Sequence, residues 1–231
     1  MKLGILGAGN LGMALASNVR EGVEVIAVKR KPVRAKFRVS TEIDAISECD
    51  VIFVTLKPGV FREMMGKIGE IAEDRPVVSF AAGVKLDEMR RYIENPFRAM
   101  TNLAVSIVAH YPQKTAEFLP LKAELMECSS EDELDAMTSY IGSSPGILAY
   151  LISAFVVSAL KDGIEYTKAV KLAVSAFKAS AELYEKYGLE EMTRKIATPG
   201  GTTVEGIAEI LDAQRILVGA LSSAASKARV L

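Results

Sequence analysis

The sequence predicts an α/β fold in which a doubly wound parallel sheet is followed by an all-helical domain. A glycine-rich turn lies between an apolar run at residues 2–6 and a helical pattern at 13–20. Apolar strand-like runs then alternate with helical patterns, as in parallel sheets covered on both faces. After about Cys128 the strand signals stop and helical patterns continue. We therefore expect domains at residues 1–128 and 129–231.

The elements of the first domain follow from the spacing of apolar residues. Strands are predicted at residues 2–6, 23–28, 50–56 and 76–80 and within 98–108, and helices at 13–20, 40–48, 60–73 and 86–93. Residues 50–56 form a nearly continuous apolar run, which is typical of a parallel strand buried on both faces. Ligands of such sheets bind beyond the carboxyl ends of the strands, so the site is expected there.

The glycine-rich turn is Gly7-Ala8-Gly9-Asn10-Leu11-Gly12, a GxGxxG pattern. Between a strand and a helix, this pattern predicts a Rossmann-type dinucleotide site with the pyrophosphate at the helix N-terminus. Gly7 permits the tight turn, Gly9 lets the backbone approach the pyrophosphate, and Gly12 lets the helix pack on the strand. A tight turn without a ligand is the alternative.

The second predicted strand ends in Lys29-Arg30-Lys31. An NAD-binding site normally has Asp or Glu near this point, to bind the ribose 2′-hydroxyl, and no acidic residue stands there. Cations suit a ribose 2′-phosphate, so NADPH is predicted as the cofactor and NADH is left open. Arg30 is the first choice for this contact, with Lys29 and Lys31 in support. A solvated basic loop is the alternative.

Composition narrows the class of protein. Half of the residues are apolar and a quarter are charged, with a formal net charge of −1, so a soluble globular protein without general affinity for nucleic acid is expected. Two cysteines indicate no disulfide framework and favour the cytoplasm. The chain opens directly on a strand-like run, so no signal peptide is expected. The most apolar stretch, residues 146–160, is shorter than the roughly 20 residues of a membrane span.

The second domain is predicted to contain four helices, at residues 131–140, 147–161 and 165–187 and from 204 towards Arg229, with a turn at 142–146. The helix at 147–161 is apolar on every side, so burial is expected. The long third helix has an apolar stripe of Val170, Val174, Phe177, Ala181 and Tyr184, and Gly188 is a plausible C-cap. A bundle of this size cannot cover all sides of the apolar helix, so dimerisation through this half is expected.

The stretch Thr198-Pro199-Gly200-Gly201-Thr202-Thr203 is predicted to be a turn that leads into the last helix. The glycines allow positive φ, and Thr202 or Thr203 can cap the helix, with Glu205 completing a capping box. Unpaired N–H groups at such a helix end suit a carboxylate or a phosphate. A helix start without a ligand is the alternative.

A more specific signal comes from segments that follow one another along nearly the whole chain. They are Gly7-Ala8-Gly9-Asn10 with Met13-Ala14, Lys57-Pro58, Ser79-Phe80-Ala81-Ala82-Gly83-Val84, Arg98-Ala99-Met100-Thr101-Asn102, Gly142-Ser143-Ser144-Pro145, and residues 198–203. In these segments the chain resembles pyrroline-5-carboxylate reductase, and the last is close to that family's Ser-Pro-Gly-Gly-Thr-Thr signature. The resemblance implies a Rossmann domain and a helical domain that forms homodimers by intertwining, often within larger rings of dimers.

The resemblance also implies the reaction, which is hydride transfer from NAD(P)H to the C=N carbon of a cyclic imino acid, giving proline. By similarity, Thr203 and Lys57 are the catalytic residues. The substrate-binding residues implied are Thr198, Gly200, Gly201, Thr202 and Asn102, and the cofactor-binding residues expected are Gly7, Gly9, Asn10, Leu11, Gly12, Lys29, Arg30, Lys31, Leu56, Lys57, Pro58 and Ala82. No metal is expected, and His110 has no role in this chemistry.

Departures from the family pattern leave other functions open. Residues 100–104 read Met-Thr-Asn-Leu-Ala where the family commonly has Met-Pro-Asn-Thr-Pro, and residues 142–147 lack the family's aromatic residue. A reductase acting on another imine and a non-catalytic NADP(H)-binding sensor are therefore alternatives. A β-hydroxyacid dehydrogenase is disfavoured, because the helix at 147–160 contains neither the Lys nor the Asn that such enzymes use.

Overall fold

The computed structural model describes residues 1–31 and 33–228, and the chain divides into two compact units. One unit comprises Met1–Ser143 together with the chain from Ala224, and the other comprises Ser144–Ser223. The boundary between these two units, at Ser143 and Ser144, falls inside the helical region of the sequence. The division of function at residues 128 and 129 stays a prediction.

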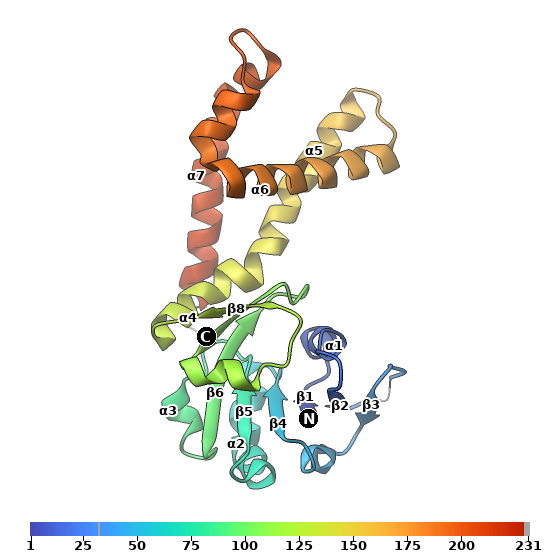
Figure 1. Cartoon of the computed structure of the whole chain (residues 1–231), viewed down its shortest axis with the longest axis vertical. Coiled ribbons are helices and arrows are strands. Elements are labelled where there is room, and N and C mark those ends of the chain that lie inside the picture. Colours follow the sequence, from blue (N-terminus) through green and yellow to red (C-terminus); the bar gives the residue numbers. More distant parts are fainter. Residues whose placement is uncertain (32, 229–231) are drawn as a thin grey trace. The chain divides into compact units, whose positions relative to one another are not determined.

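The first unit is built on one sheet of eight strands (Figure 1). The strands are β1 (Lys2–Leu6), β2 (Glu24–Val28), β3 (Arg38–Ser40), β4 (Val51–Val54), β5 (Pro76–Ser79), β6 (Asn95–Thr101), β7 (Ile107–Tyr111) and β8 (Glu124–Glu127), in the order β3-β2-β1-β4-β5-β6-β7-β8. All neighbours are parallel except β6 and β7. Because β1 has β2 on one side and β4 on the other, a switch point lies at the carboxyl end of β1. The predicted fold class is confirmed.

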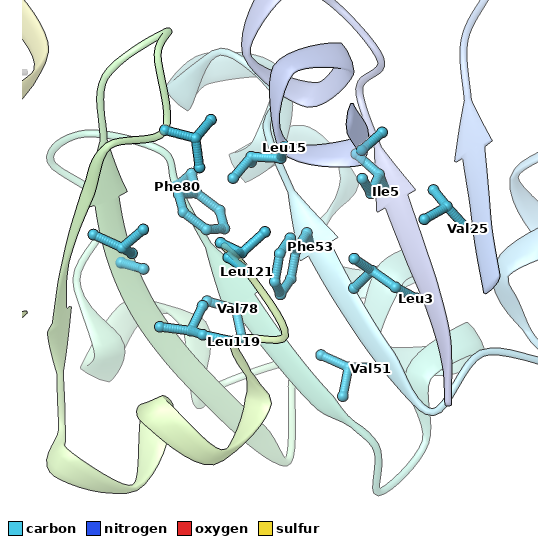
Figure 2. Close-up of a cluster of buried hydrophobic side chains, with 14 of the residues drawn as sticks. Leu3, Ile5, Leu15, Val25, Val51, Phe53, Val78, Phe80, Leu119 and Leu121 are labelled. Carbon is cyan, nitrogen blue, oxygen red and sulfur yellow. The ribbon is translucent and has the colours of Figure 1, made fainter. Parts of the chain in front are cut away.

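Both faces of the sheet are covered by helices. The helix α1 (Asn10–Ser17) packs on one face, while α2 (Pro58–Ala72) and the short α3 (Leu86–Met89) pack on the other. Successive residues of β1 alternate between the faces, with Leu3 and Ile5 in one cluster and Leu6 in the other. Figure 2 shows the first cluster, where the Phe53 and Phe80 rings lie 5.1 Å apart. Apolar packing thereby covers the face of the sheet on which α1 lies.

The prediction of a helix at residues 40–48 is wrong. The chain forms β3 and then only a short 3₁₀-helix, η1 (Ile43–Ile46). The Glu42 amide donates to the Ser40 hydroxyl at 3.0 Å, and such local side-chain bonds compete with helix formation. The helix expected at 86–93 ends early, at Met89. A second 3₁₀-helix, η2 (Gln113–Phe118), follows β7.

The prediction of a turn at residues 142–146 is also wrong. The helix α4 (Glu131–Thr138) continues through a π-helical turn, Ser139–Ser143, into α5 (Ser144–Lys161). Pro145 lies just after the π-helical turn, so the hydrogen bond that proline cannot donate falls where the regular α-helical ladder is already interrupted. The continuous helix of 31 residues is long and apolar enough to cross a membrane by length and composition. One such helix is weak evidence for a span, because core helices of soluble proteins pass the same test. The expectation that residues 146–160 do not span a membrane stays a prediction.

The second unit contains α5, α6 (Tyr166–Ile196) and most of α7 (Thr202–Ala228). Gly188 breaks α6 with a φ of +68°, as expected of a glycine cap. Within the single chain α5 is only partly covered, since Val156 and Ala159 are buried but Tyr150 is 80% exposed. Its full burial, with a subunit interface as cover, stays a prediction. The predicted end of α7 at Arg229 lies outside the described residues.

The apolar stripe predicted for α6 is largely exposed as well. Val174 is 38% exposed and Tyr184 is 59% exposed, whereas Ala169 and Ala173 are buried against α5. Small alanines let the two helix backbones approach closely, and this contact turns the larger side chains outward. The helical unit therefore presents apolar surface on both α5 and α6.

Candidate active site

The glycine-rich turn connects β1 to α1 with the tight geometry that its glycines permit. Gly7 has a φ of +102°, a conformation that residues with side chains rarely adopt. The amides of Gly7 and Ala8 both donate to the Val28 carbonyl, at 3.2 and 3.0 Å. The turn is therefore tied to the carboxyl end of β2, beside the switch point of the sheet.

Gly12 lies where the first helix meets the neighbouring strand. A Cβ placed on it would be 2.6 Å from the Gly7 carbonyl oxygen and 2.8 Å from the Thr55 hydroxyl. That hydroxyl donates a 2.6 Å hydrogen bond to the same Gly7 carbonyl. The predicted packing role of Gly12 thus has a concrete partner, Thr55, which the sequence did not identify.

The start of α1 provides the donors that a dinucleotide needs. Gly9 is its N-cap and no side chain caps the helix, so amide groups of the first turn, at Asn10 and Leu11, are left without a capping partner. A Cβ on Gly9 would meet only the Gly7 carbonyl oxygen, at 3.9 Å, so the space above this residue is open. The turn therefore fits a pyrophosphate, which binds at such a helix end.

An open cleft of about 1050 Å³ lies over this turn. Its walls contain seven of the predicted cofactor residues, namely Gly7, Gly9, Lys29, Arg30, Lys31, Leu56 and Lys57. The structure thus brings together the turn, the basic segment after β2 and the segment after β4. Parallel register explains this, because Leu6 pairs with both Val28 and Val54.

Two other predicted cofactor residues sit at the ends of neighbouring elements. Lys57 is the exposed N-cap of α2 and Pro58 is its first residue, where proline is favoured. Ala82 lies in the turn after β5 and packs partly buried against the cluster around Met100. Neither Pro58 nor Ala82 lines the cleft, so the structure does not bring them together with the basic segment.

The sequence did not predict that Thr41, Glu42 and Ile43 also line the cleft. These residues follow β3, which pairs in parallel with β2 so that Val28 lies opposite Ser40. The signal was hidden because residues 40–48 were interpreted as one helix. An acidic side chain therefore stands near the predicted ribose site after all, although it comes from another strand.

Asn102 is half-buried in the loop between β6 and β7. Its amide nitrogen donates to the Ser106 hydroxyl at 3.0 Å, and its side-chain oxygen accepts from the Ala104 amide at 3.0 Å. The same loop holds the buried Val105 at a φ of +51°, which is strained for a β-branched residue. The described contacts of Asn102 thus shape this loop.

The glycine turn of the second unit leads into α7. Gly200 has a φ of +70°, and a Cβ on Gly201 would come within 2.5 Å of the Thr198 hydroxyl. The helix begins at Thr202, so Gly201 precedes it and the expected threonine cap is wrong. The Gly201 amide donates to the Thr198 carbonyl at 2.9 Å. Thr203 is half-buried, whereas Thr198 and Thr202 are exposed.

His110 is buried on β7, and its Nδ1 atom has no hydrogen-bond partner. It does not line the cleft. Among the described residues, no group of three or more His, Cys, Asp or Glu side chains could hold a metal ion. Lys57 and the basic segment bring positive charge to the cleft, and Glu42 brings a negative charge.

Comparison with known proteins follows the same two parts of the chain. A model of the pyrroline-5-carboxylate reductase dimerisation domain matches residues 131–231, and a model of coenzyme F420-dependent NADP oxidoreductases matches residues 2–83. The pyrroline-5-carboxylate reductases of Aquifex aeolicus and Escherichia coli K12 are each 27% identical, over 90% and 89% of this chain and 88% of their own lengths. That of Arabidopsis thaliana is 26% identical over 100% of this chain and 95% of its own.

Solved structures share the fold along the whole chain. The Plasmodium falciparum pyrroline carboxylate reductase with NADP bound has a TM-score of 0.89 at 18% identity, and covers 100% of this chain and 97% of its own. The Streptococcus pyogenes 1-pyrroline-5-carboxylate reductase has a TM-score of 0.85 at 22% identity, with 100% and 99% covered.

A dinucleotide cleft on a Rossmann-type sheet, followed in sequence by a helical dimerisation domain, defines an NAD(P)H-dependent oxidoreductase. The matches run through both parts of the chain in order, and the curated relatives extend over nine-tenths of it. The chain is similar to pyrroline-5-carboxylate reductases along nine-tenths of its length, at 27% identity, and its residues 131–231 match the dimerisation domain of that family. The resemblance in the sequence motifs is thereby confirmed.

Proposed function

We propose that this protein reduces the C=N bond of a cyclic imino acid with NADPH, converting 1-pyrroline-5-carboxylate to proline in the cytoplasm. The observation that carries the proposal is the cleft, in which the glycine-rich turn and three consecutive cations face the same space. The names of the relatives supply the substrate.

The cleft holds the cofactor at several points. The amides at the start of α1 take the pyrophosphate, and Arg30, with Lys29 and Lys31, takes the ribose 2′-phosphate. Lys57, together with Leu56 and Pro58 and with Ala82 after the next strand, lies towards the nicotinamide end. NADPH supplies the hydride, and the protein positions its donor face.

The substrate carboxylate is assigned to the turn before α7. The amides of Gly200 and Thr202 stand where a helix end favours an anion. Gly201 lies between them in this proposed site, with its own amide bonded to the Thr198 carbonyl. No side-chain cap from Thr202 or Thr203 to these amides occurs among the described hydrogen bonds. The Thr203 hydroxyl is assigned to the ring nitrogen of the substrate, and Thr198 and Asn102 are assigned to substrate binding. These assignments follow the family resemblance.

The reaction needs little acid–base catalysis from the protein. The imine nitrogen is protonated before or during hydride attack, and water or the Thr203 hydroxyl supplies that proton. No strong base is needed, which fits a buried His110 outside the cleft. Holding two bound molecules in reacting geometry can lower the barrier by roughly 7–11 kcal/mol. Catalysis is therefore mainly positioning.

The match to a dimerisation domain supports oligomerisation through the helical half, and we propose a homodimer or a larger ring of dimers. The exposed apolar residues of α5 and α6 are the surface for it. A groove between these helices is lined by residues such as Phe155, Ala159 and Leu172. A partner helix in this groove would give α5 the cover that its own chain lacks.

The test is NADPH oxidation, followed by absorbance, with pyrroline-5-carboxylate and with the six-membered cyclic imine. We expect turnover that falls at least about a hundredfold in Thr203→Ala, as for loss of a transition-state donor, with NADPH binding unchanged. Thr193→Ala is the matched control, because its hydroxyl only bonds the Leu189 carbonyl within α6. Tight NADPH binding without oxidation of either imine would overturn the proposal and favour a sensor.

A further inference from the structure

The end of β3 brings a carboxylate to the basic segment of the cofactor cleft. Lys29 donates from its amide to the Ser40 carbonyl at 2.9 Å, which continues the parallel ladder of β2 and β3. The residues that follow these two strands therefore run side by side. Lys29-Arg30-Lys31 and Thr41-Glu42-Ile43 line the same cleft.

Local hydrogen bonds involve both the backbone and the side chain of Glu42. Its amide donates to the Ser40 hydroxyl at 3.0 Å, and the Thr41 hydroxyl donates to its carboxylate at 3.3 Å. Within the described part of the chain, Glu42 forms no ion pair with Lys29, Arg30 or any other base. Its negative charge is therefore not cancelled by a direct partner.

The cations and the carboxylate in this cleft have opposite effects on the binding of NADP(H) and NAD(H). A ribose 2′-phosphate is attracted by Arg30 and repelled by Glu42. A ribose without that phosphate offers a hydroxyl, which a carboxylate accepts well, as the acidic residue after the second strand does in NAD sites. The cations thus favour NADPH, and the carboxylate favours NADH.

We propose that Glu42 is a specificity-determining residue, which narrows the preference for NADP(H) over NAD(H) that the basic segment creates. The inference rests on the proposed cofactor function and adds a residue to it. Glu42 comes from the end of the third strand, so it can supply the missing carboxylate without occupying the usual position. This protein therefore binds both NADP(H) and NAD(H), and the ratio of the two affinities depends on the opposing charges of Arg30 and Glu42.

The test measures binding rather than turnover. Adenosine 2′,5′-bisphosphate and 5′-AMP carry the two forms of the ribose without the nicotinamide, and calorimetry gives their dissociation constants. Glu42→Gln is expected to tighten the bisphosphate about threefold to tenfold, because it removes one nearby like charge, and not to tighten 5′-AMP. The same ratio is measured for NADP⁺ and NAD⁺.

Asp44→Asn is the matched control. Asp44 lies two residues further along, in η1, and does not line the cleft, so the same change in net charge is expected to alter the ratio less than twofold. Raising the salt concentration is expected to shrink the effect of Glu42→Gln, because mobile ions screen exposed charges.

Two results would overturn the inference. An unchanged ratio in Glu42→Gln, with wild-type binding intact, shows that the carboxylate does not face the ribose. An equal change in Asp44→Asn shows a general charge effect. Failure of the wild-type protein to bind NADP⁺ or NAD⁺ is a different outcome, because it removes the proposed cofactor function itself and the inference with it.

Discussion

The Arg98 guanidinium lies 2.6 Å from the Asp135 carboxylate and is only 2% exposed, so a charged side chain from the sheet is paired with α4 inside the first unit. Its second nitrogen is 2.7 Å from Glu131. Lys85 adds a further pair with Asp135 at 2.6 Å. This network, rather than apolar packing alone, ties the start of the helical region to β6.

Removing one partner of this network should destabilise the protein strongly. Asp135→Asn leaves Arg98 buried with less compensation, and a loss of about 3 kcal/mol in the free energy of unfolding is expected. Asp132→Asn is the control, because Asp132 is 93% exposed and contacts only Lys85, and about 0.5 kcal/mol or less is expected. Urea unfolding at one fixed protein concentration measures both. Equal effects would show that burial of Arg98 does not matter.

The same pair makes stability depend on pH. Burial acts to raise the pKa of Asp135, but hydrogen bonds from Lys85 and Arg98 outweigh it and hold that pKa below its ordinary value of 3.8. The ionised pair therefore stabilises the fold above pH 3.8, and this contribution is lost as pH falls through the lowered pKa. The stability gap between wild type and Asp135→Asn should shrink below about pH 4. A gap that is constant from pH 7 to strong acid would contradict this.

Gly12 is expected to tolerate no side chain. Gly12→Ala places a Cβ against the Gly7 carbonyl and Thr55, so a loss of about 1–3 kcal/mol in stability is expected, with NADP⁺ binding about tenfold weaker. Gly66→Ala is the control, because its Cβ would meet only a Tyr92 carbon at 3.9 Å. That change should stabilise α2 by about 0.5–1 kcal/mol. Thermal unfolding and NADP⁺ titration decide between these outcomes.

A charge on the exposed apolar face of α5 should break the oligomer. Phe155 is 39% exposed in the single chain and lines the groove between α5 and α6. Burying a Phe side chain is worth about 1.5–3 kcal/mol, and Phe155→Asp replaces that gain by a desolvated charge. Sedimentation should show monomers at concentrations where the wild type is assembled. Lys67→Asp, on the exposed side of α2, should leave assembly intact.

The sequence predicted the parts of the site that local chemistry decides. The glycines at Gly7 and Gly200 take the positive φ values that their turns require, because a tight turn is encoded within a few residues. The basic segment after β2 also lines the cleft as expected. Those predictions needed no knowledge of distant residues.

Other parts depended on segments far apart in the chain. Glu42 enters the cleft only because β3 pairs in parallel with β2, and a pairing register is not encoded in either strand alone. Thr55 meets Gly12 across the β1–β4 pairing in the same way. Both residues were absent from the predicted site.

By itself the sequence determined the fold class and the glycine turns, because periodicity and turn residues report local backbone preference and burial. Its motifs, taken in order, carried the resemblance to pyrroline-5-carboxylate reductase. Only the tertiary structure decided which side chains share the cleft, that α4 runs on into α5, and that Tyr150 on α5 is left exposed. Apolar periodicity predicts that a helix face is buried, but it does not indicate whether the residues that bury it belong to the same chain.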